Sequence, residues 1–336
     1  MKKHTLFPAI ICCTAMVLLI LDAKCALISA REGVELCICT VIPSLFPFLL
    51  LSSLLNASFL GATGTLLRPL NKFCRIPNGA EPLLLIGLLG GYPVGAKNIQ
   101  AAFIGGQLSK SDSIRMLSFC NNAGPAFIFG FLSPIFDNKW LLVLLWGIHI
   151  LSALLTCLFL PGNPVGVCKP RPSKAPNITI AMESALKSSA LICGWVVIFR
   201  VLIGFFTRWF LWMVPKEVQV IFTGLLELTN GCAGLKEIPS TTLRFILAEL
   251  FLSFGGLCVL MQTAAVSAPL PVCSYIKGKL IQTTISLFLS VAALPLFSNI
   301  PFSVTICGII PILIVAIKKV VAFTGNMRYN KEKSLQ

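Results

Sequence analysis

Two glutamates lie inside apolar stretches of the second half of the sequence, where carboxylates are uncommon. Glu227 stands within GLLELTNG at 224–231, and Glu249 lies within the apolar stretch 243–266. An ionised carboxylate in hydrocarbon is costly, and such a group usually takes up a proton, pairs with a cation or binds an ion. We therefore expect Glu227 and Glu249 to couple a cation, Na⁺ or H⁺, to the function of the protein. For Glu249 the alternative is a structural pairing with Arg244.

A second group of residues suits a bound anion. Backbone amides at a helix break around 90–95 can donate to a carboxylate, and the positive end of a half-helix dipole adds to the attraction. A cation inside an apolar stretch, such as Arg200, needs a partner. The residues expected to bind substrate are Gly90, Gly91, Tyr92, Lys97, Asn121, Asn122, Arg200, Thr229, Asn230 and Ser253. As alternatives, Lys97 extends to the membrane surface and Arg200 pairs with Glu227 or Glu249.

Other chemistry has little support in the sequence. The 14 Cys are scattered without CxxC pairs, and His4 and His149 lie far from acidic clusters. Neither a zinc site nor a reactive thiol is predicted. Because no nucleophile has a nearby base and no phosphate-binding loop occurs, an enzyme would depend on Glu227 and Ser253 alone. We expect no enzymatic activity and no cofactor beyond the coupling cation.

The composition indicates a polytopic membrane protein. Hydrophobic residues make up 56% of the chain, the mean hydropathy is +0.90 and only 12% of residues are charged, against about 25% in ordinary soluble domains. The net charge of +15 comes from Lys and Arg in short loops and at the termini. That distribution is typical of positive-inside topology rather than of nucleic-acid binding.

The apolar pattern predicts an all-α fold with about eight transmembrane helices and two re-entrant hairpins. The stretches long enough to span a bilayer are 6–21, 33–55, 114–136, 140–160, 191–213, 243–266, 280–297 and 304–321. Two further apolar pieces, 82–106 and 218–234, are interrupted by Gly, Pro or Asn. Broken backbone at membrane depth survives only beside protein or a water-filled cavity, which favours hairpins there.

The two broken pieces belong to an internal repeat. GLLGGYPVGAK at 87–97 and GLLELTNGCAGL at 224–235 are each followed by Leu-Ser-Phe, at 117–119 and 252–254. An odd number of spans per copy makes the repeat inverted, as in transporters whose substrate site lies between two such hairpins. The expected domains are an anchor with its loop at 1–32, repeats at 33–160 and 181–298, a linker at 161–180, and a last helix with basic tail at 299–336. As an alternative, the Gly-rich segments are ordinary helices in close contact.

The basic residues predict the orientation of the chain. Lys2 and Lys3 precede the first apolar stretch without a small-x-small cleavage site after it, which indicates a signal anchor with a cytoplasmic N-terminus. Counting spans from there places the Pro-rich loop 161–178, Lys277, Lys279 and the basic tail inside. Both termini are therefore expected to be cytoplasmic, and Cys168 should be protected from external reagents.

Four motifs together resemble a known family. They are VIPSLFPFLLLSSLL at 41–55, GGYPVGAK at 90–97, FCNNAGPAFI at 119–128 and GLLELTNG at 224–231. They are similar to the YlbJ family of sporulation integral membrane proteins, within the nucleoside recognition or Gate domain proteins, over nearly all of 33–321. The resemblance implies a stage V sporulation transporter that moves dipicolinate across the outer, mother-cell-derived forespore membrane.

The architecture is also similar to that of the concentrative nucleoside transporters, with informative differences. Each hairpin of those proteins supplies a glutamate that holds nucleoside, whereas here the first hairpin has Gly90, Gly91 and Tyr92. We expect a small anion, dipicolinate above all, and the lipid bilayer as partners, no nucleic acid, and compatibility with a homo-oligomer. The alternatives are a transporter of nucleosides or other dicarboxylates, and a non-transporting membrane scaffold needed for spore maturation.

Overall fold

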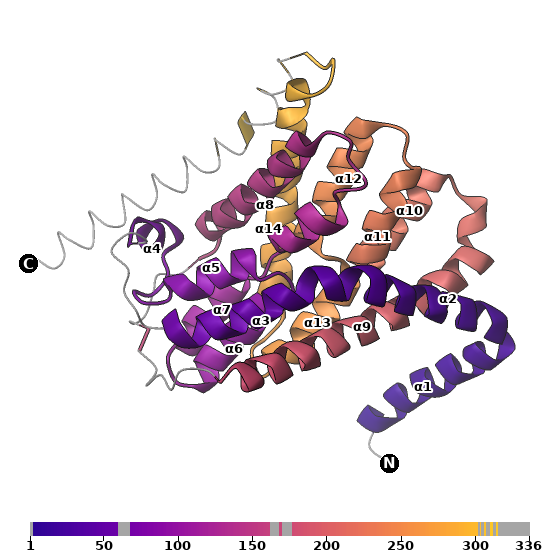
Figure 1. The fold of residues 1–336 in the computed structure, drawn as a ribbon, viewed down its shortest axis with the longest axis horizontal. Helices are drawn as coiled ribbons and strands as arrows, with labels where there is room; N and C mark the ends of the chain where they lie inside the picture. The colour runs from indigo at the N-terminus through magenta and orange to yellow at the C-terminus, as the bar shows by residue number, and fades with distance from the viewer. Residues whose placement is uncertain are drawn as a thin grey trace, which may run out of the picture.

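The computed structural model describes residues 3–59, 68–161, 168–169 and 177–301, and a few helical positions between 303 and 314. Every regular element in this part of the chain is a helix, and no strand occurs in it (Figure 1). The predicted all-α fold is confirmed. Most of the predicted linker 161–180 and of the last span and basic tail lies outside the described residues.

The helices divide between the two halves of the chain. The first half contains α1 (Lys3–Leu21), α2 (Ala23–Leu36), η1 (Cys37–Val41), α3 (Ile42–Phe59), α4 (Arg68–Cys74), α5 (Glu81–Leu89), α6 (Val94–Ile104), α7 (Lys110–Leu117), η3 (Ala126–Phe131) and α8 (Lys139–Phe159). The second half contains α9 (Ile178–Trp209), η4 (Leu211–Met213), α10 (Lys216–Leu226), α11 (Leu228–Gly234), η5 (Leu235–Glu237), α12 (Thr241–Phe254), α13 (Gly256–Ser267), α14 (Cys273–Ala293) and η6 (Leu294–Leu296).

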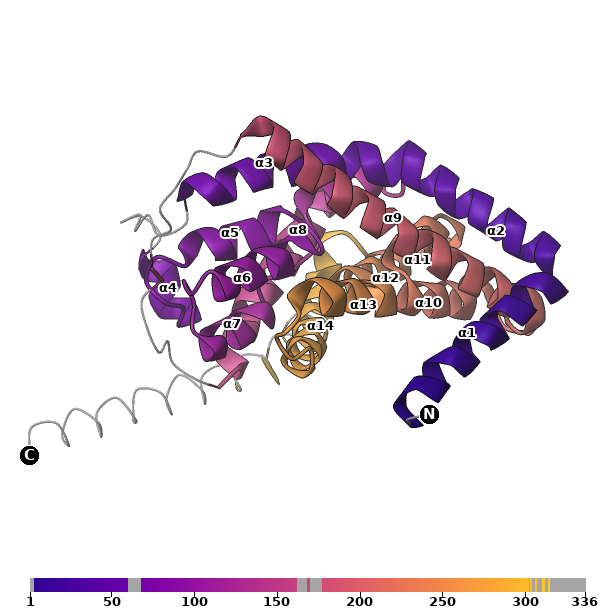
Figure 2. The ribbon, with the colours of Figure 1, turned by 90° about the horizontal axis from the view of Figure 1, so that it is seen from below.

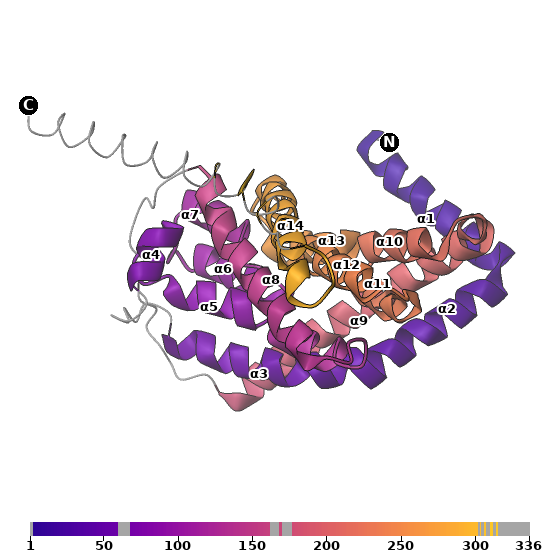
Figure 3. The same ribbon diagram turned by 90° about the horizontal axis from the view of Figure 1, so that it is seen from above.

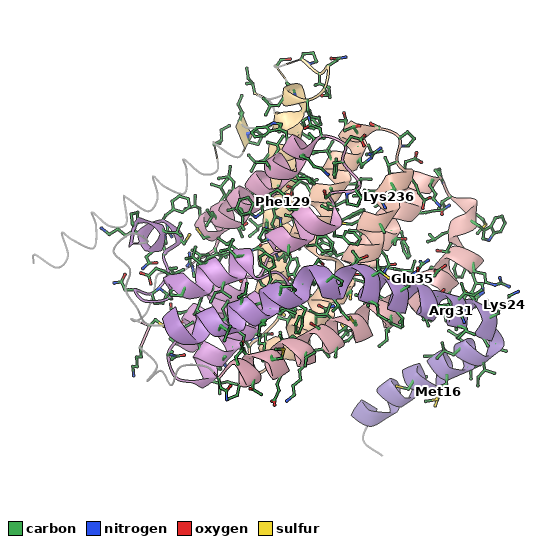
Figure 4. The ribbon with its side chains drawn as sticks, in the orientation of Figure 1. Met16, Lys24, Arg31, Glu35, Phe129 and Lys236 are labelled. Atoms are coloured by element: carbon green, nitrogen blue, oxygen red, sulfur yellow. The ribbon has the colours of Figure 1, made fainter. Side chains whose placement is uncertain are left out.

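Five helical segments of the described chain are long and apolar enough to cross a membrane. They are 23–54, 139–159, 178–209, 241–267 and 273–296. Each overlaps a predicted span, which supports an integral membrane protein. The predicted span 6–21 falls on α1, which projects from the bundle with the exposed side chain of Met16 (Figure 4).

The predicted second span is part of a longer helix than expected. A continuous helical stretch runs from α2 through η1 into α3, although α2 carries several charges. Lys24, Arg31 and Glu35 are exposed on its outer side (Figure 4), so the charges do not interrupt it. The helix begins after Asp22, whose side chain accepts a hydrogen bond from the backbone N–H of Cys25, as an N-cap does.

The long helices α2, α3 and α9 form one side of the molecule (Figure 2). Gly204 of α9 faces Ser29 of α2, and a Cβ at Gly204 would lie 2.0 Å from the Ser29 hydroxyl oxygen. Because a small residue lets two helices approach closely, this glycine sets the distance between α2 and α9. The ends of the pair are joined by the ion pair of Arg208 with Asp22, 2.7 Å between nitrogen and oxygen.

The predicted span 114–136 is wrong. Helix α7 ends at Leu117, an irregular stretch follows, and the short π-helix η3 begins only at Ala126. The interruption contains Asn121, Asn122 and Gly124, which are buried. Their polar groups bond to neighbouring segments instead of continuing a helix, and hydropathy alone does not detect this. We call residues 118–125 the first break.

The predicted span 243–266 is interrupted as well. Helix α12 ends at Phe254 with Gly255 as its C-cap, and α13 starts at Gly256; both glycines have positive φ, +82° and +77°. Only glycine adopts this conformation readily. We call this point the second break. Figure 3 shows α14 lying between α8 on one side and α12 and α13 on the other.

Each broken apolar piece is a pair of short helices packed on the break of its own half. In the first hairpin, α5 and α6 with the turn between them, a Cβ at Gly87 or Gly95 would lie 2.0 Å or 1.9 Å from the carbonyl oxygen of Cys120. In the second hairpin, α10 and α11, the backbone at Gly224 faces Gly256 of the second break. The Gly-rich segments are therefore broken, as expected for hairpins, and also closely packed, as in the alternative of helices in close contact.

Candidate functional site

The two hairpins meet at a cavity of about 40 Å³. Its wall includes Gly91 and Tyr92 of the first hairpin, Gly124 of the first break, and Glu227 and Thr229 of the second hairpin. The remaining wall is largely apolar. By this measure a water molecule needs about 10–15 Å³, so the cavity holds a few waters at most. A larger solute would require the walls to move.

The Glu227 carboxylate caps helix α11. Its two oxygens accept hydrogen bonds from the backbone N–H of Thr229 (2.9 Å), the backbone N–H of Asn230 (2.6 Å) and the side-chain amide of Asn230 (2.6 Å). The structure thus brings together three residues predicted for the site. Their hydrogen bonds are made to one another, and capping alone explains a glutamate at the start of a helix.

Asn121 and Asn122 hold the first break in place and do not line the cavity. The Asn121 oxygen accepts from the backbone N–H of Ala96 (3.3 Å), and its nitrogen donates to the hydroxyl of Thr263 (3.0 Å). The Asn122 nitrogen donates to the carbonyl of Phe119 (2.7 Å). Both side chains are fully buried, so they link the first break to the first hairpin and to α13.

Tyr92 connects the cavity wall to the second half of the chain. Its hydroxyl donates to the carbonyl oxygen of Leu252, at the end of α12 (3.0 Å). The same hydroxyl oxygen accepts a hydrogen bond from the ammonium group of Lys279 (2.8 Å). Gly255 of the second break lies beside the ring, since a Cβ there would be 3.5 Å from the ring carbon that bears the hydroxyl.

Lys279 is a central residue of the site that the sequence reasoning missed. The sequence placed Lys279 on the cytoplasmic side, before the predicted span 280–297. In the structure it lies within α14 and is 2% exposed, while its side of the membrane stays a prediction. The neighbouring Gly278 allows this position, since a Cβ there would lie 2.0 Å from the Ser118 carbonyl oxygen. The missed signal is a buried polar stripe along α14: Lys279, Gln282, Thr283, Ser286 and Ser290. Polar residues at helical spacing in a membrane helix mark an inward face.

Lys97 lies apart from the cavity between the hairpins. Its ammonium donates to the hydroxyls of Ser184 (2.7 Å) and Ser188 (3.0 Å) on α9. It lines two smaller cavities, of about 20 and 30 Å³, near α3 and α9. The expectation that Lys97 stands beside Gly91 at the anion site is therefore not supported by its position.

Arg200 forms an ion pair with Glu32 of α2. Its predicted substrate role and its predicted alternative pairings with Glu227 or Glu249 find no support in this arrangement. Arg244 also turns away from Glu249, because its guanidinium donates to the carbonyl oxygens of Ile238 and Ile135. The partners of Arg200 and Arg244 cannot be predicted from the separation of residues along the sequence.

Glu249 is fully buried on α12, and neither carboxylate oxygen has a hydrogen-bond partner among the described residues. The hydroxyl of Ser253 donates to the backbone carbonyl of Glu249 (2.6 Å) and not to its carboxylate. Ser286 of α14 lies near the carboxylate. Glu249 therefore differs from Glu227, whose oxygens are all engaged.

No group of three or more His, Cys, Asp or Glu side chains that could hold a metal ion is found in the part of the chain that the structure describes.

Comparison with known proteins supports the resemblance seen in the motifs. No family model and no solved structure matches the chain. The sporulation integral membrane protein YlbJ of Bacillus subtilis (strain 168) is 24% identical in a 284-residue alignment that covers 71% of this chain and 69% of that protein. The chain is thus distantly similar to a sporulation integral membrane protein of the YlbJ type.

Proposed function

We propose that this protein is a membrane transporter of a small anionic solute. The observation that carries the proposal is the cavity between the two broken hairpins, to which Gly91 and Glu227 both contribute. Irregular backbone at membrane depth is expected only where it lines a cavity or packs in protein. Discontinuous helices from two halves that meet at one point are typical of secondary transporters.

The similar protein supports a role in sporulation, and the motifs suggest dipicolinate as the solute. The relative's name describes a sporulation integral membrane protein, and the family resemblance implies dipicolinate as solute. We therefore propose that the protein moves dipicolinate across the outer forespore membrane, with both termini in the mother-cell cytoplasm. The inverted arrangement of the two halves is part of this proposal.

Two alternatives are less well supported. In a nucleoside transporter a hairpin glutamate must accept hydrogen bonds from the solute, but both oxygens of Glu227 already accept from the start of α11. A membrane scaffold needs neither the broken hairpins nor the cavity. As the sequence led us to expect, we propose no catalytic activity.

Uptake into proteoliposomes tests the proposal. Purified protein should take up labelled dipicolinate with saturable kinetics, and excess unlabelled dipicolinate should compete. Labelled uridine, tested in the same vesicles, should enter no faster than in protein-free vesicles. Saturable uridine uptake without dipicolinate uptake would favour the nucleoside alternative, and no saturable flux of either solute would favour a scaffold.

A further inference from the structure

Lys279 is a buried ammonium group whose acceptors are all neutral. Its nitrogen donates to the hydroxyl oxygen of Tyr92 (2.8 Å), the side-chain oxygen of Asn122 (3.1 Å) and that of Gln282 (2.7 Å). It also lies 4.8 Å from the centre of the Tyr92 ring. None of the ion pairs found among the described residues includes it. A buried charge normally has a partner of opposite sign. Here the hydrogen-bond partners are instead the neutral polar groups of Tyr92, Asn122 and Gln282.

The groups around Lys279, among them His149 within electrostatic range of it, add donors rather than acceptors. The Nε2 atom of His149 accepts from the backbone N–H of Ala123 (3.1 Å), so the neutral ring carries its proton on Nδ1, and Nδ1 has no partner in the described chain. The oxygen of Gln282 accepts from Lys279, and its amide nitrogen is also unpartnered there. His149 and Gln282 are both fully buried. A carboxylate is the ligand that would use such unsatisfied donors together with the ammonium.

This cluster lies directly behind the wall of the cavity between the hairpins. Tyr92 and Ala123 line that cavity, and they are the residues bonded to Lys279 and His149, respectively. Tyr92 therefore links the ammonium to the cavity wall. Its other hydrogen bond, to Leu252, ties the first hairpin to the end of α12, so a movement of this hairpin would uncover Lys279.

We propose that Lys279, assisted by His149 and Gln282, binds a carboxylate group of the transported solute, which replaces the Tyr92 hydroxyl as acceptor when the first hairpin moves. The proposal rests on the proposed transport function and specifies its ligand class: a solute with at least one carboxylate. Lys279 is then the charge that makes the site select anions, in place of Lys97 and Arg200.

The competing interpretation is that Lys279 is a structural cross-link between α14 and the first hairpin, with Glu249 as a counter-charge. Glu249 lies within electrostatic range of Tyr92, but the α14 residue near its carboxylate is Ser286, two helical turns beyond Lys279. A cross-link would fix the folded structure and would not discriminate between charged and neutral ligands.

Ligand stabilisation of the purified, full-length protein tests the proposal. The two probes are dipicolinate and its neutral diamide, which has the same ring and similar size. Dipicolinate should raise the melting temperature of the wild type, whereas the diamide should not. In Lys279→Gln the dissociation constant for dipicolinate should rise by about ten- to a hundredfold, as expected for a lost charged hydrogen bond. Lys277→Gln, exposed on the same helix, is the matched control and should bind like the wild type.

Two further variants keep the test decisive if Lys279→Gln does not fold. Tyr92→Phe removes the hydroxyl that competes for Lys279, so dipicolinate should bind as tightly as in the wild type or several-fold more tightly. Lys279→Gln combined with Glu249→Gln removes both buried charges; it should fold but respond equally to dipicolinate and the diamide. Unchanged, dipicolinate-selective binding in either Lys279→Gln protein would overturn the proposal, as would loss of binding in a folded Tyr92→Phe protein.

The outcomes also separate this inference from the transport proposal. Normal dipicolinate uptake by Lys279→Gln would overturn the role of Lys279 and leave transport intact. Selective binding that depends on Lys279, without flux in proteoliposomes, would support the anion site and refute transport. If the wild type binds neither probe selectively, the carboxylate site is refuted.

Discussion

At the scale of single residues, three buried ionisable side chains differ in how their hydrogen-bonding groups are used. Glu227 accepts three hydrogen bonds at the start of α11, Lys279 donates three, and the Glu249 carboxylate makes none to the described residues. Removing a satisfied charge leaves its partners unpaired, whereas removing an unpartnered one does not. The consequences of substitution therefore differ between these positions.

Glu227→Gln should lower the stability of the protein. Glutamine keeps one accepting oxygen, so at least one of the hydrogen bonds at the start of α11 is lost together with the favourable charge at the helix N-terminus. We expect a loss of about 1–2 kcal/mol, measured as a lower melting temperature in detergent. Glu183→Gln, exposed on α9, is the control and should leave it unchanged; equal melting temperatures for the two variants would contradict the capping role.

Glu249→Gln should preserve stability but change coupling. A neutral amide replaces a carboxylate that has no partner in the described chain, so the melting temperature should stay within about 1 °C or rise, because the costly ionised form is removed. If Glu249 carries the coupling proton, uptake driven by an imposed pH gradient should be lost while exchange of internal for external dipicolinate continues. Unimpaired gradient-driven accumulation would rule out this role.

At the scale of elements, the breaks depend on glycines for two different reasons. Gly91, Gly255 and Gly256 have positive φ, which other residues adopt at a cost. Gly87 and Gly95 instead sit so close to Cys120 that any side chain would collide with its carbonyl. A substitution at Gly91 therefore combines backbone strain with a change at the cavity, and the two effects must be separated.

Gly91→Ala and Gly106→Ala form a matched pair for this purpose. Both positions have positive φ, +78° and +67°, but a Cβ at Gly106 would meet no atom within 4 Å, whereas Gly91 lines the cavity. Both variants should lose about 1 kcal/mol of stability from backbone strain. Only Gly91→Ala should also reduce dipicolinate uptake in proteoliposomes. Equal uptake by the two variants would show that Gly91 contributes conformation alone.

At the scale of the whole molecule, the two halves present elements in the same order. Each half has a long helix, two short helices, an interrupted segment and another long helix. In the first half these are α2 to α3, then α5 and α6, then α7 to η3, then α8. In the second half they are α9, then α10 and α11, then α12 to α13, then α14. The inversion of the second half remains a prediction. Superposition of 33–160 on 181–297 about an axis in the membrane plane would test it, and parallel halves would contradict it.

Topology needs a better reporter than Cys168. This cysteine is 2% exposed, and burial raises the pKa of its thiol to about 11, so poor labelling would not show on which side it lies. The exposed Cys273 at the start of α14 should be cytoplasmic and unlabelled by an impermeant maleimide in whole cells. A cysteine at the exposed Asp137 should be labelled. Cys273→Ser is the control, and a reversed pattern would refute the orientation.

Much of this protein follows from the sequence alone. The apolar composition and the long hydrophobic stretches determine an all-α membrane fold, because a chain with so few charges has no soluble surface and helices satisfy their own backbone. Gly-rich interruptions at 87–97 and 224–235 predicted two broken hairpins, because Gly, Pro and Asn are poor residues for an uninterrupted helix. These are local properties, readable within one segment.

Only the tertiary structure determines which partners the buried polar side chains have. The stretch 114–136 is apolar enough to span, yet it breaks because Asn121 and Asn122 find partners in α6, α13 and α14, far away in the sequence. In the sequence, Lys279 cannot be distinguished from a lysine at the end of a span. In the structure, Gly278 lets α14 pack against the first break, and Lys279 is buried beside Tyr92. Such pairings depend on distances between segments, and hydropathy and spacing contain no information about those distances.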